Sequence, residues 1–246
     1  MKKKPQLQRN ILLTVEFDGT NYAGWQIQPN KPTVQGKLQT ALHQLFGTAT
    51  KLYGCSRTDA GVSACNYLAN FFTSSTLPVA KITRALNYYL PRDIFVKSAV
   101  AVPLDFHARY SVRAKTYSYR IVLTRSPLRA RHAWEYPYPL NLNRLKSAAR
   151  LFTGKKDYNP FCHTKEKNGF CRITSIRIKH LDDEITIFIR GDRFLYKMVR
   201  RIVGALLAYS TGRLTQQDLR AAIAGKKSKP FITAPASGLT LEQAHY

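Results

Sequence analysis

The segment YGCSRTDAGVSAC, residues 53–65, places one carboxylate among small and uncharged neighbours. Asp59 follows Arg57 by two residues and precedes Gly61, which gives the backbone extra freedom. In an extended segment residues i and i+2 lie on one face, so the guanidinium and the carboxylate can point the same way. A single ionised carboxylate can serve as a nucleophile or as a general base. An Arg–Asp pair can equally stabilise a loop, and the local pattern supports both interpretations.

The segment RAKTYSYRI, residues 113–121, combines cations with aromatic rings. Tyr117 and Tyr119 lie on one face of the expected strand, and Arg113 and Lys115 precede them. Aromatic residues on a strand commonly pack in a core, and that explanation is open for both tyrosines. RNA-binding proteins also use such rings to stack bases while cations hold the phosphates. Arg113 and Lys115 are therefore candidates for RNA contact.

A third segment, FLYKMVRRIVG at residues 194–204, places two arginines inside an apolar helix. Apolar residues recur at helical spacing and predict a buried face made of Phe194, Met198, Ile202 and Leu206. Arg200 and Arg201 lie between them, so one of the two must turn partly inward. A buried arginine needs an anion, and Asp59 is one of few carboxylates available. The sequence does not itself pair them.

The segment DFHARYS, residues 105–111, adds a histidine and an arginine after an expected strand. A turn role for Asp105 and a satisfied polar role for His107 explain both residues, while Arg109 is a further candidate for RNA contact. The sequence has no GxGxxG, no P-loop, no HExxH and no Cys–His nucleophile pattern. If the protein is an enzyme, it is expected to use neither a nucleotide cofactor nor a metal.

The net charge points to an anionic partner. Lys and Arg number 39 against 14 Asp and Glu, which gives +25 in a protein that is 44% hydrophobic. A polyphosphate backbone is the best candidate, and an anionic membrane is weaker because no amphipathic helix rich in Lys, Arg and Trp is present. The longest apolar run, residues 202–209, is too short for a bilayer, and residues 1–10 do not resemble a signal peptide. We therefore expect a cytoplasmic protein whose four cysteines are free thiols.

Three alternatives stay open at this point. A zinc site can be drawn from two cysteines and two histidines, but its spacing matches no common pattern: Cys162, His163, Cys171 and His180. A metal-dependent nuclease would need carboxylates clustered on Mg²⁺, such as Asp18, Asp59 and Asp105. A non-catalytic RNA-binding or assembly protein would explain the charge, but not the Asp59 loop or Arg200.

The elements that must position these residues follow one order twice. The first half predicts strand, helix, strand, strand, helix and strand, over residues 10–19, 33–47, 50–56, 65–73, 78–91 and 93–102. The second half repeats this order loosely over residues 114–123, 141–154, 171–181, 184–191 and 193–212, with a shorter helix at 215–224 and a closing strand near 238–244. Basic loops with aromatic residues are expected at 124–139 and 153–171.

The fold class is therefore predicted to be α+β, with two similar ferredoxin-like βαββαβ halves. Residues 1–104 form the half that carries the Asp59 loop, and residues 105–246 form the half with the Tyr117 strand and the Arg200 helix. We expect the two sheets to meet and form a central cleft, which is the usual place for a site.

Six motifs resemble, in order, the landmark motifs of the TruA-type tRNA pseudouridine synthases of bacteria: EFDGTNYAGWQ, VQGKLQTAL, SRTDAGVSA, DFHARYS, KTYSYRI and FLYKMVRRIVG. The resemblance runs from about residue 11 to the C-terminus, and RTDAGV is its most specific part. It implies the pseudouridine synthase fold, a homodimer, and no metal or organic cofactor. It also implies that uridine becomes pseudouridine at positions 38, 39 and 40, in the anticodon stem-loop of tRNA.

The resemblance also implies roles for four residues. Asp59 matches the catalytic aspartate of the family, and Tyr117 matches the active-site tyrosine stacked against the target base. Arg200 matches the basic residue paired with the aspartate, and Arg57 matches an arginine that handles the flipped nucleotide. Such a base must leave its stack before it can react, and an aromatic ring can receive it.

Two positions depart from the family pattern. Ser56 stands where the family usually has Gly, and Ser63 stands where it usually has His. Any RNA contact made by that histidine is therefore not expected here. The role implied for Asp59 is unaffected, because the reaction only breaks and remakes one bond to the sugar and needs no water, redox step or phosphate.

Overall fold

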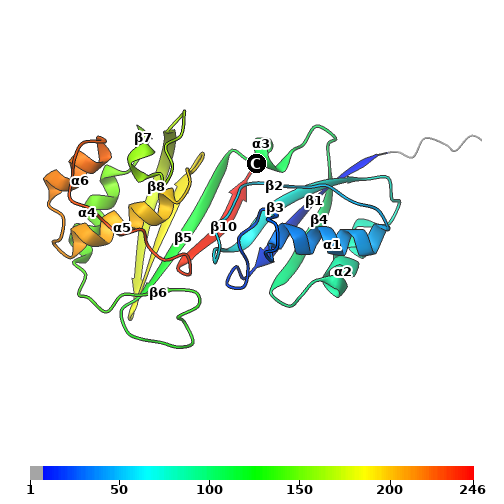
Figure 1. Ribbon diagram of the computed structural model, residues 1–246, viewed down its shortest axis with the longest axis horizontal. Coiled ribbons are helices and arrows are strands. Elements are labelled where there is room, and N and C mark those ends of the chain that lie inside the picture. The colour runs from blue at the N-terminus through cyan, green and yellow to red at the C-terminus, as the bar shows by residue number, and fades with distance from the viewer. Residues whose placement is uncertain (1–7) are drawn as a thin grey trace, which may run out of the picture. The chain divides into compact units, whose positions relative to one another are not determined.

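The computed structural model describes residues 8–246 (Figure 1). Residues 1–7, within the basic stretch judged above to be unlike a signal peptide, lie outside the described residues. The chain divides into two compact units, of which one runs to Arg113 and also includes Leu241–Tyr246, while the other is Ala114–Thr240. The strand β10, Leu239–His245, therefore begins in the second unit and ends in the first.

The first unit contains an antiparallel sheet with strand order β4-β1-β3, and β2 pairs with β3. Its elements are β1 (Arg9–Phe17), α1 (Val34–Phe46), β2 (Leu52–Gly54), β3 (Ser63–Thr73), α2 (Val79–Tyr89), β4 (Ile94–Val102) and the short helix α3 (Ala108–Ser111). The first six follow the predicted β-α-β-β-α-β order, which is thereby confirmed.

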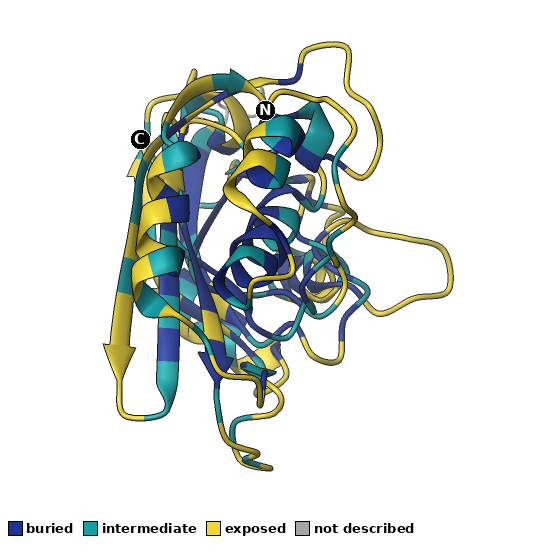
Figure 2. Ribbon diagram, turned by 90° about the vertical axis from the view of Figure 1, so that its left-hand side faces the viewer, coloured by how far each residue is buried: buried dark blue, intermediate teal, exposed yellow. Residues whose placement is uncertain are grey.

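Helix α1 begins and ends where its sequence predicts. The Thr33 side chain accepts a hydrogen bond from the Gly36 amide at 3.3 Å, and Gly47 ends the helix in the left-handed conformation at φ 69°. Both are standard terminal devices. One helix face is buried through Val34, Leu38, Ala41 and Leu42. Figure 2 shows the same pattern in both units, because buried stretches follow the strands and the helix surfaces turned toward them.

The second unit contains a sheet with strand order β5-β9-β8-β7, all antiparallel, and β6 pairs in parallel with β5. Its elements are β5 (Ala114–Val122), β6 (Trp134–Glu135), α4 (Leu142–Leu151), β7 (Gly154–Asp157), the 3-10 helix η1 (Asn159–Phe161), β8 (Phe170–Leu181), β9 (Glu184–Gly191), α5 (Met198–Ser210) and α6 (Gln216–Ile223). The second βαββαβ order and the α+β class are confirmed.

Two features of the second unit differ from the sequence prediction. Helix α5 begins at Met198 rather than near residue 193, because Lys197 adopts the left-handed conformation at φ 59° and interrupts the helical path. Strand β7 lies inside the region predicted as the loop 153–171, where it pairs with the beginning of β8. Within residues 8–246 no helix is both long and apolar enough to cross a bilayer.

Candidate active site

The Asp59 loop joins β2 to β3 and contains a tight turn. The Val62 amide donates to the Asp59 carbonyl at 3.2 Å, and Gly61 has φ 78°. This left-handed position is one that glycine occupies without a steric penalty. The Asp59 side chain is half-buried at the surface of the turn, whereas Thr58 beside it is buried. The sequence therefore fixes the backbone on both sides of the carboxylate.

The loop is fastened to a second segment, residues 19–25, that is distant in sequence. The Trp25 amide donates to the Thr58 carbonyl at 3.3 Å, and the Gly61 amide donates to the Tyr22 carbonyl at 3.2 Å. Gly24 has φ 97°, and a Cβ there would lie 2.3 Å from the Thr58 carbonyl oxygen. The two backbones are therefore in direct contact, and glycine is required for that approach.

The two departures from the family pattern both lie within this structure. The Ser63 hydroxyl accepts a hydrogen bond from the Gly19 amide at 3.0 Å, so it holds the second segment from the other side of the loop. The Ser56 carbonyl accepts a short hydrogen bond from the Tyr67 hydroxyl, and the Tyr67 ring stacks on Trp25 with centroids 4.0 Å apart. Ser63 thus has a structural role that needs no RNA.

Arg57 extends from the loop toward solvent. Its side chain is exposed, and its Nε donates to Gln26 Oε1 at 3.2 Å. Gln26 belongs to the motif EFDGTNYAGWQ, so the glutamine that ends this motif orients the arginine. Sequence reasoning missed Gln26, and its only signal was its place inside that motif.

Tyr117 lies on β5, on the buried side of the sheet in the second unit. It is opposite Ile189 of β9, and only 7% of its surface is exposed. The Phe194 ring meets it edge to face with centroids 5.1 Å apart. This contact fixes the orientation of the Tyr117 ring, as a base-stacking platform requires.

Arg200 lies in the first turn of α5 and is fixed by a segment that follows α6. Its Nε donates to the Ala234 carbonyl at 2.7 Å, and the Ala234 amide donates to the Arg200 carbonyl at 3.1 Å. A Cβ on Gly204 would lie 1.8 Å from the Ile232 carbonyl oxygen, so the same segment touches the helix backbone one turn later. The arginine is therefore positioned by three backbone contacts along one face of α5.

Tyr119, two residues after Tyr117, is a structural residue. It is fully buried, and its hydroxyl donates to the Pro235 carbonyl at 2.8 Å. Burial raises the pKa of Tyr119 well above its ordinary value, although the charge of nearby Arg200 acts in the opposite direction. Its phenol therefore stays neutral and serves to hold the segment that positions Arg200.

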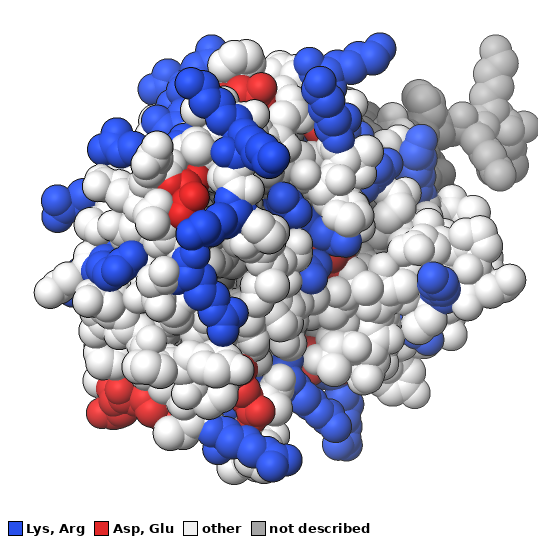
Figure 3. Space-filling view, turned by 60° about the vertical axis from the view of Figure 1, so that its left-hand side comes forward, with Lys and Arg blue, Asp and Glu red and all other residues white. Residues whose placement is uncertain are grey.

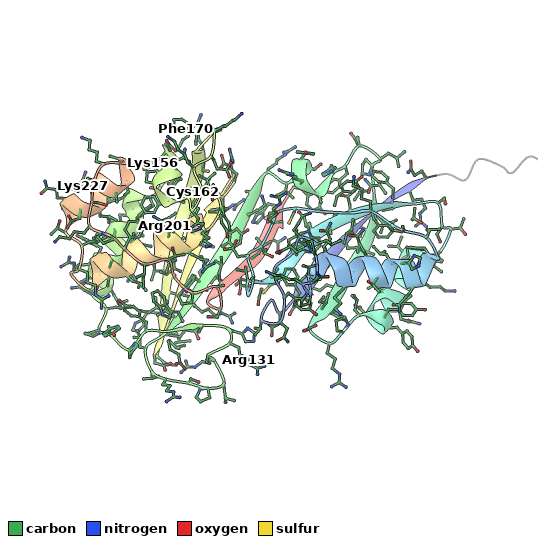
Figure 4. The ribbon with its side chains drawn as sticks, in the orientation of Figure 1. Arg131, Lys156, Cys162, Phe170, Arg201 and Lys227 are labelled. Carbon is green, nitrogen blue, oxygen red and sulfur yellow. The ribbon has the colours of Figure 1, made fainter. Side chains whose placement is uncertain are left out.

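Both arginines of the α5 motif are partly buried. Arg201 donates from Nη2 to the Pro160 carbonyl at 3.3 Å, and its guanidinium lies 5.3 Å from the centre of the Phe231 ring (Figure 4). Its Nε is buried and finds no hydrogen-bond partner among the described residues. The prediction that one of the pair turns inward is therefore fulfilled by Arg200 and Arg201 together.

The other candidate RNA contacts lie near the end of the first unit and the start of the second. Arg109 is exposed on α3, with its guanidinium 5.7 Å from the centre of the Tyr110 ring. Arg113 is exposed, and its amide donates to the His245 carbonyl at 2.7 Å. Lys115 is half-buried. The positions of these cations leave them free to meet a ligand only at Arg109 and Arg113, where the side chains reach solvent.

Helix α3 is held by two buried asparagines that sequence reasoning did not select. Asn70 donates to Asn10 Oδ1 at 2.9 Å and accepts from the Ala108 amide at 2.8 Å. Asn10 in turn donates to the Phe106 carbonyl at 2.8 Å. Both asparagines are at most 1% exposed, so this network fixes the segment that carries Arg109.

The charges and possible metal ligands were also surveyed across residues 8–246. No group of three or more His, Cys, Asp or Glu side chains in this range could hold a metal ion. Asp18, Asp59 and Asp105 therefore do not form the carboxylate cluster that the nuclease alternative needs. Figure 3 shows one face of the molecule, on which Lys and Arg far outnumber Asp and Glu.

The four principal candidates are divided between the two units. Arg57 and Asp59 belong to the first unit, while Tyr117 and Arg200 belong to the second. Within each unit the backbone around the candidate is fixed by contacts from distant segments. That the four side chains share one cleft stays a prediction.

Comparison with known proteins identifies the family. The model of the tRNA pseudouridine synthase family matches residues 13–111 and 148–246. A protein named tRNA pseudouridine synthase A from Caldicellulosiruptor bescii is 42% identical over 243 residues, covering 97% of this chain and 100% of that protein. Proteins of the same name from Ruminiclostridium cellulolyticum and Clostridium acetobutylicum are 42% and 37% identical, again over 97% of this chain and their full length. The chain belongs to the tRNA pseudouridine synthase family and has the α+β pseudouridine synthase fold.

Proposed function

We propose that this protein is an isomerase that converts uridine to pseudouridine at positions 38, 39 and 40 of tRNA, with Asp59 as the catalytic residue. The observation that carries the proposal is the fixed backbone of the Asp59 loop, which is held by Gly61 and by contact with Gly24. Such a support is unnecessary for an ordinary surface carboxylate, but it is required for a group that must meet a substrate atom at a set position.

The proposed reaction is balanced without any other reactant. The C1′–N1 bond of uridine breaks, the base turns, and C1′ joins C5. The proton on C5 then leaves and N1 gains one, so the product is an isomer of the substrate. Asp59 can attack the sugar or the base as a nucleophile, or it can remove a proton from the sugar. All three roles require the same ionised carboxylate.

The other candidates have supporting roles in this proposal. Tyr117 receives the flipped uridine, because a ring held by Phe194 can stack on a base. Arg200 supports the charge of Asp59, and its own position is fixed by Ala234. Arg57, which is held by Gln26, guides the nucleotide as it leaves the stack. Arg109, Arg113 and Lys115 contribute contacts to phosphates.

The proposal also names the assembly and its location. The partner is tRNA, to which the excess of Lys and Arg is suited. We propose that the enzyme is a cytoplasmic homodimer and that it uses neither a metal nor an organic cofactor. Light scattering on the purified protein gives its mass directly, and a monomer at micromolar concentration would contradict the dimer.

The experiment that tests the activity uses tRNA labelled in uridine and scored for pseudouridine. We expect pseudouridine at positions 38 to 40, with the same yield in the presence of EDTA. Loss of activity with EDTA would favour a metal-dependent reaction instead. An Asp59→Ala protein that binds tRNA, forms no pseudouridine and yet restores growth effects of a deletion would favour a non-catalytic RNA-binding role.

A further inference from the structure

Strands β7, β8 and β9 of the second unit have one buried face and one exposed face. On β9 the residues Ile185, Ile187 and Ile189 are fully buried, and helix α4 contacts β8 on this side. The cross-strand register places Ile176 and Ile178 on the same side. Because side chains alternate along a strand, the residues between them point to the opposite side. That opposite side is called the outer face below.

The outer face carries a row of cations. Five exposed basic side chains lie on it: Lys155 of β7, Arg172, Arg177 and Lys179 of β8, and Arg190 of β9. Lys155 lies opposite Arg172, and Arg190 lies opposite Ser175. Along one strand, alternate residues are about 6.6 to 6.8 Å apart, and neighbouring strands are about 4.8 Å apart. The five charges therefore form a continuous basic surface.

Two aromatic rings lie among these cations. Phe170, at the start of β8, is 55% exposed, and Lys155 Nζ lies 5.9 Å from its ring centre (Figure 4 labels Phe170 and the neighbouring Lys156 of β7). Phe188 of β9 lies opposite Arg177, and Lys179 Nζ is 5.5 Å from its ring centre. An exposed phenylalanine on a sheet gains nothing from water, but it can stack on a base.

The carboxylates of the outer face lie at its two ends and are already engaged. Asp157 accepts a hydrogen bond from the Asn159 amide at 2.9 Å, and Glu184 accepts one from the Thr186 hydroxyl at 3.1 Å. Among residues 8–246, none of the five cations forms an ion pair with a carboxylate. The mutual repulsion of the five charges is therefore relieved only by ions from outside the chain.

The chemistry of this surface selects one kind of partner. A second copy docked by a two-fold axis would bring a basic face against the same basic face, which is unfavourable. A nucleic acid supplies a phosphate for each nucleotide and a base for each exposed ring. A sheet that stacks bases on aromatic residues while cations hold phosphates is a known mode of RNA recognition. RNA is thus the partner that satisfies both the charges and the rings.

We propose that the outer face of β7, β8 and β9 is an RNA-binding surface that holds part of the tRNA other than the target nucleotide. The proposal rests on the proposed function for the identity of the RNA. Tyr117 lies opposite Ile189 on the buried face, so the sheet itself separates it from Arg177 and Arg190. A uridine stacked on Tyr117 cannot also contact the outer face, and the surface must bind a different segment.

The test replaces three cations of the outer face with glutamine in the full-length protein. The variant Arg177→Gln/Lys179→Gln/Arg190→Gln is compared with Lys81→Gln/Arg84→Gln/Arg92→Gln, which removes three exposed cations of the first unit. The affinity for a full-length tRNA transcript is measured at several salt concentrations between 50 and 200 mM. Each phosphate contact contributes about 0.7 to 0.9 to the slope of log affinity against log salt. Loss of three contacts should therefore reduce the salt effect over this range by roughly 20- to 40-fold.

We expect this loss only in the outer-face variant, with KM for tRNA raised and kcat at saturating tRNA unchanged. Phe170→Ala should weaken binding, whereas Phe170→Tyr should preserve it. Equal salt slopes for both triple variants and wild type would overturn the proposal. A changed oligomeric mass with an unchanged salt slope would also overturn it, in favour of a protein interface.

The same data separate this inference from the proposed function. If wild-type protein forms no pseudouridine but the outer-face variant loses its salt slope, the activity is wrong and the RNA-binding surface stands. If pseudouridine forms normally and the outer-face variant binds like the control, the activity stands and the surface is refuted.

Discussion

The backbone of Gly24 lies directly against the backbone of Thr58, one residue before the proposed catalytic Asp59. A Cβ at position 24 would lie 2.3 Å from the Thr58 carbonyl oxygen and 3.0 Å from the Asp59 carbonyl carbon. Gly24 also has φ 97°, a conformation that other residues rarely adopt. The position of the carboxylate is therefore coupled to a glycine 35 residues earlier in the chain, a separation given by the difference between 59 and 24.

Gly24→Ala is expected to displace the Asp59 loop and to reduce pseudouridine formation more than it reduces tRNA binding. The left-handed conformation and the overlap together should cost about 1 to 3 kcal/mol of stability. Activity should fall at least ten-fold, because a catalytic group shifted by about 1 Å loses about 100-fold in rate. The measurements are kcat, tRNA affinity and thermal melting of the variant.

Gly47→Ala is the matched control for this change. Gly47 also has a positive φ, 69°, but a Cβ there would meet nothing within 4 Å. It should lower the melting temperature through the backbone conformation alone and leave kcat unchanged. Equal loss of activity in the two variants would contradict the link between Gly24 and Asp59, since both would then act only through stability.

Local sequence signals predicted much of each unit. The repeated order of elements followed from periodicity, and the ends of α1 followed from Thr33 and Gly47. The turn between β8 and β9 followed from two adjacent aspartates, and Asp182 does adopt the left-handed conformation at φ 51°. These features depend on neighbours in sequence, so a pattern can reveal them.

Features that depend on distant partners were not predictable. The residues of β7, GKKD, have no apolar alternation, and they become a strand only because β8 offers hydrogen bonds. The start of α5 depends on the left-handed conformation of Lys197. At the site, the chemical type of Asp59 drew attention to its loop, but the contacts from Gly24 and Gln26 arise from tertiary packing. Only the family motifs linked these segments in advance.

The ion pair of Asp183 predicts one pH effect on stability. Hydrogen bonds from Arg129 and Thr124 hold the pKa of Asp183 well below its ordinary value. The unfolded pKa is near ~3.9, so this stabilisation is present above that pH and is lost as the pH falls toward the folded pKa. The difference in melting temperature between wild type and Asp183→Asn should therefore be constant near neutral pH and shrink below about pH 4. A difference that grew on acidification would contradict this sign.

Tyr117 is expected to matter through its ring and its hydroxyl. Tyr117→Phe keeps the ring against Phe194 and removes the hydroxyl, while Tyr117→Ala removes both. We expect Ala to reduce kcat at least as much as Phe, because the flipped base loses its stacking surface. Burial of the ring means that Tyr117→Ala also costs about 3 to 5 kcal/mol of stability, so the assay is run below the melting temperature of each variant.

Tyr119→Phe is the control for the loss of a hydroxyl near the same strand. It removes the hydrogen bond to Pro235 but no proposed substrate contact, and it should cost about 1 kcal/mol with little change in kcat. Wild-type turnover in both Tyr117 variants would leave Tyr117 as a packing residue.

Asp59→Asn separates the chemistry from the binding of RNA. Asparagine has nearly the shape of aspartate, but it is neutral and cannot act as a nucleophile or as an ordinary base. Removing a negative charge from a strongly basic protein should not weaken its attraction for phosphate. We expect no pseudouridine and a tRNA affinity within about two-fold of wild type, with Asp182→Asn as an exposed control that keeps full activity. Thermal melting shows whether each variant is folded, and a folded Asp59→Asn protein with normal turnover would remove Asp59 from the mechanism.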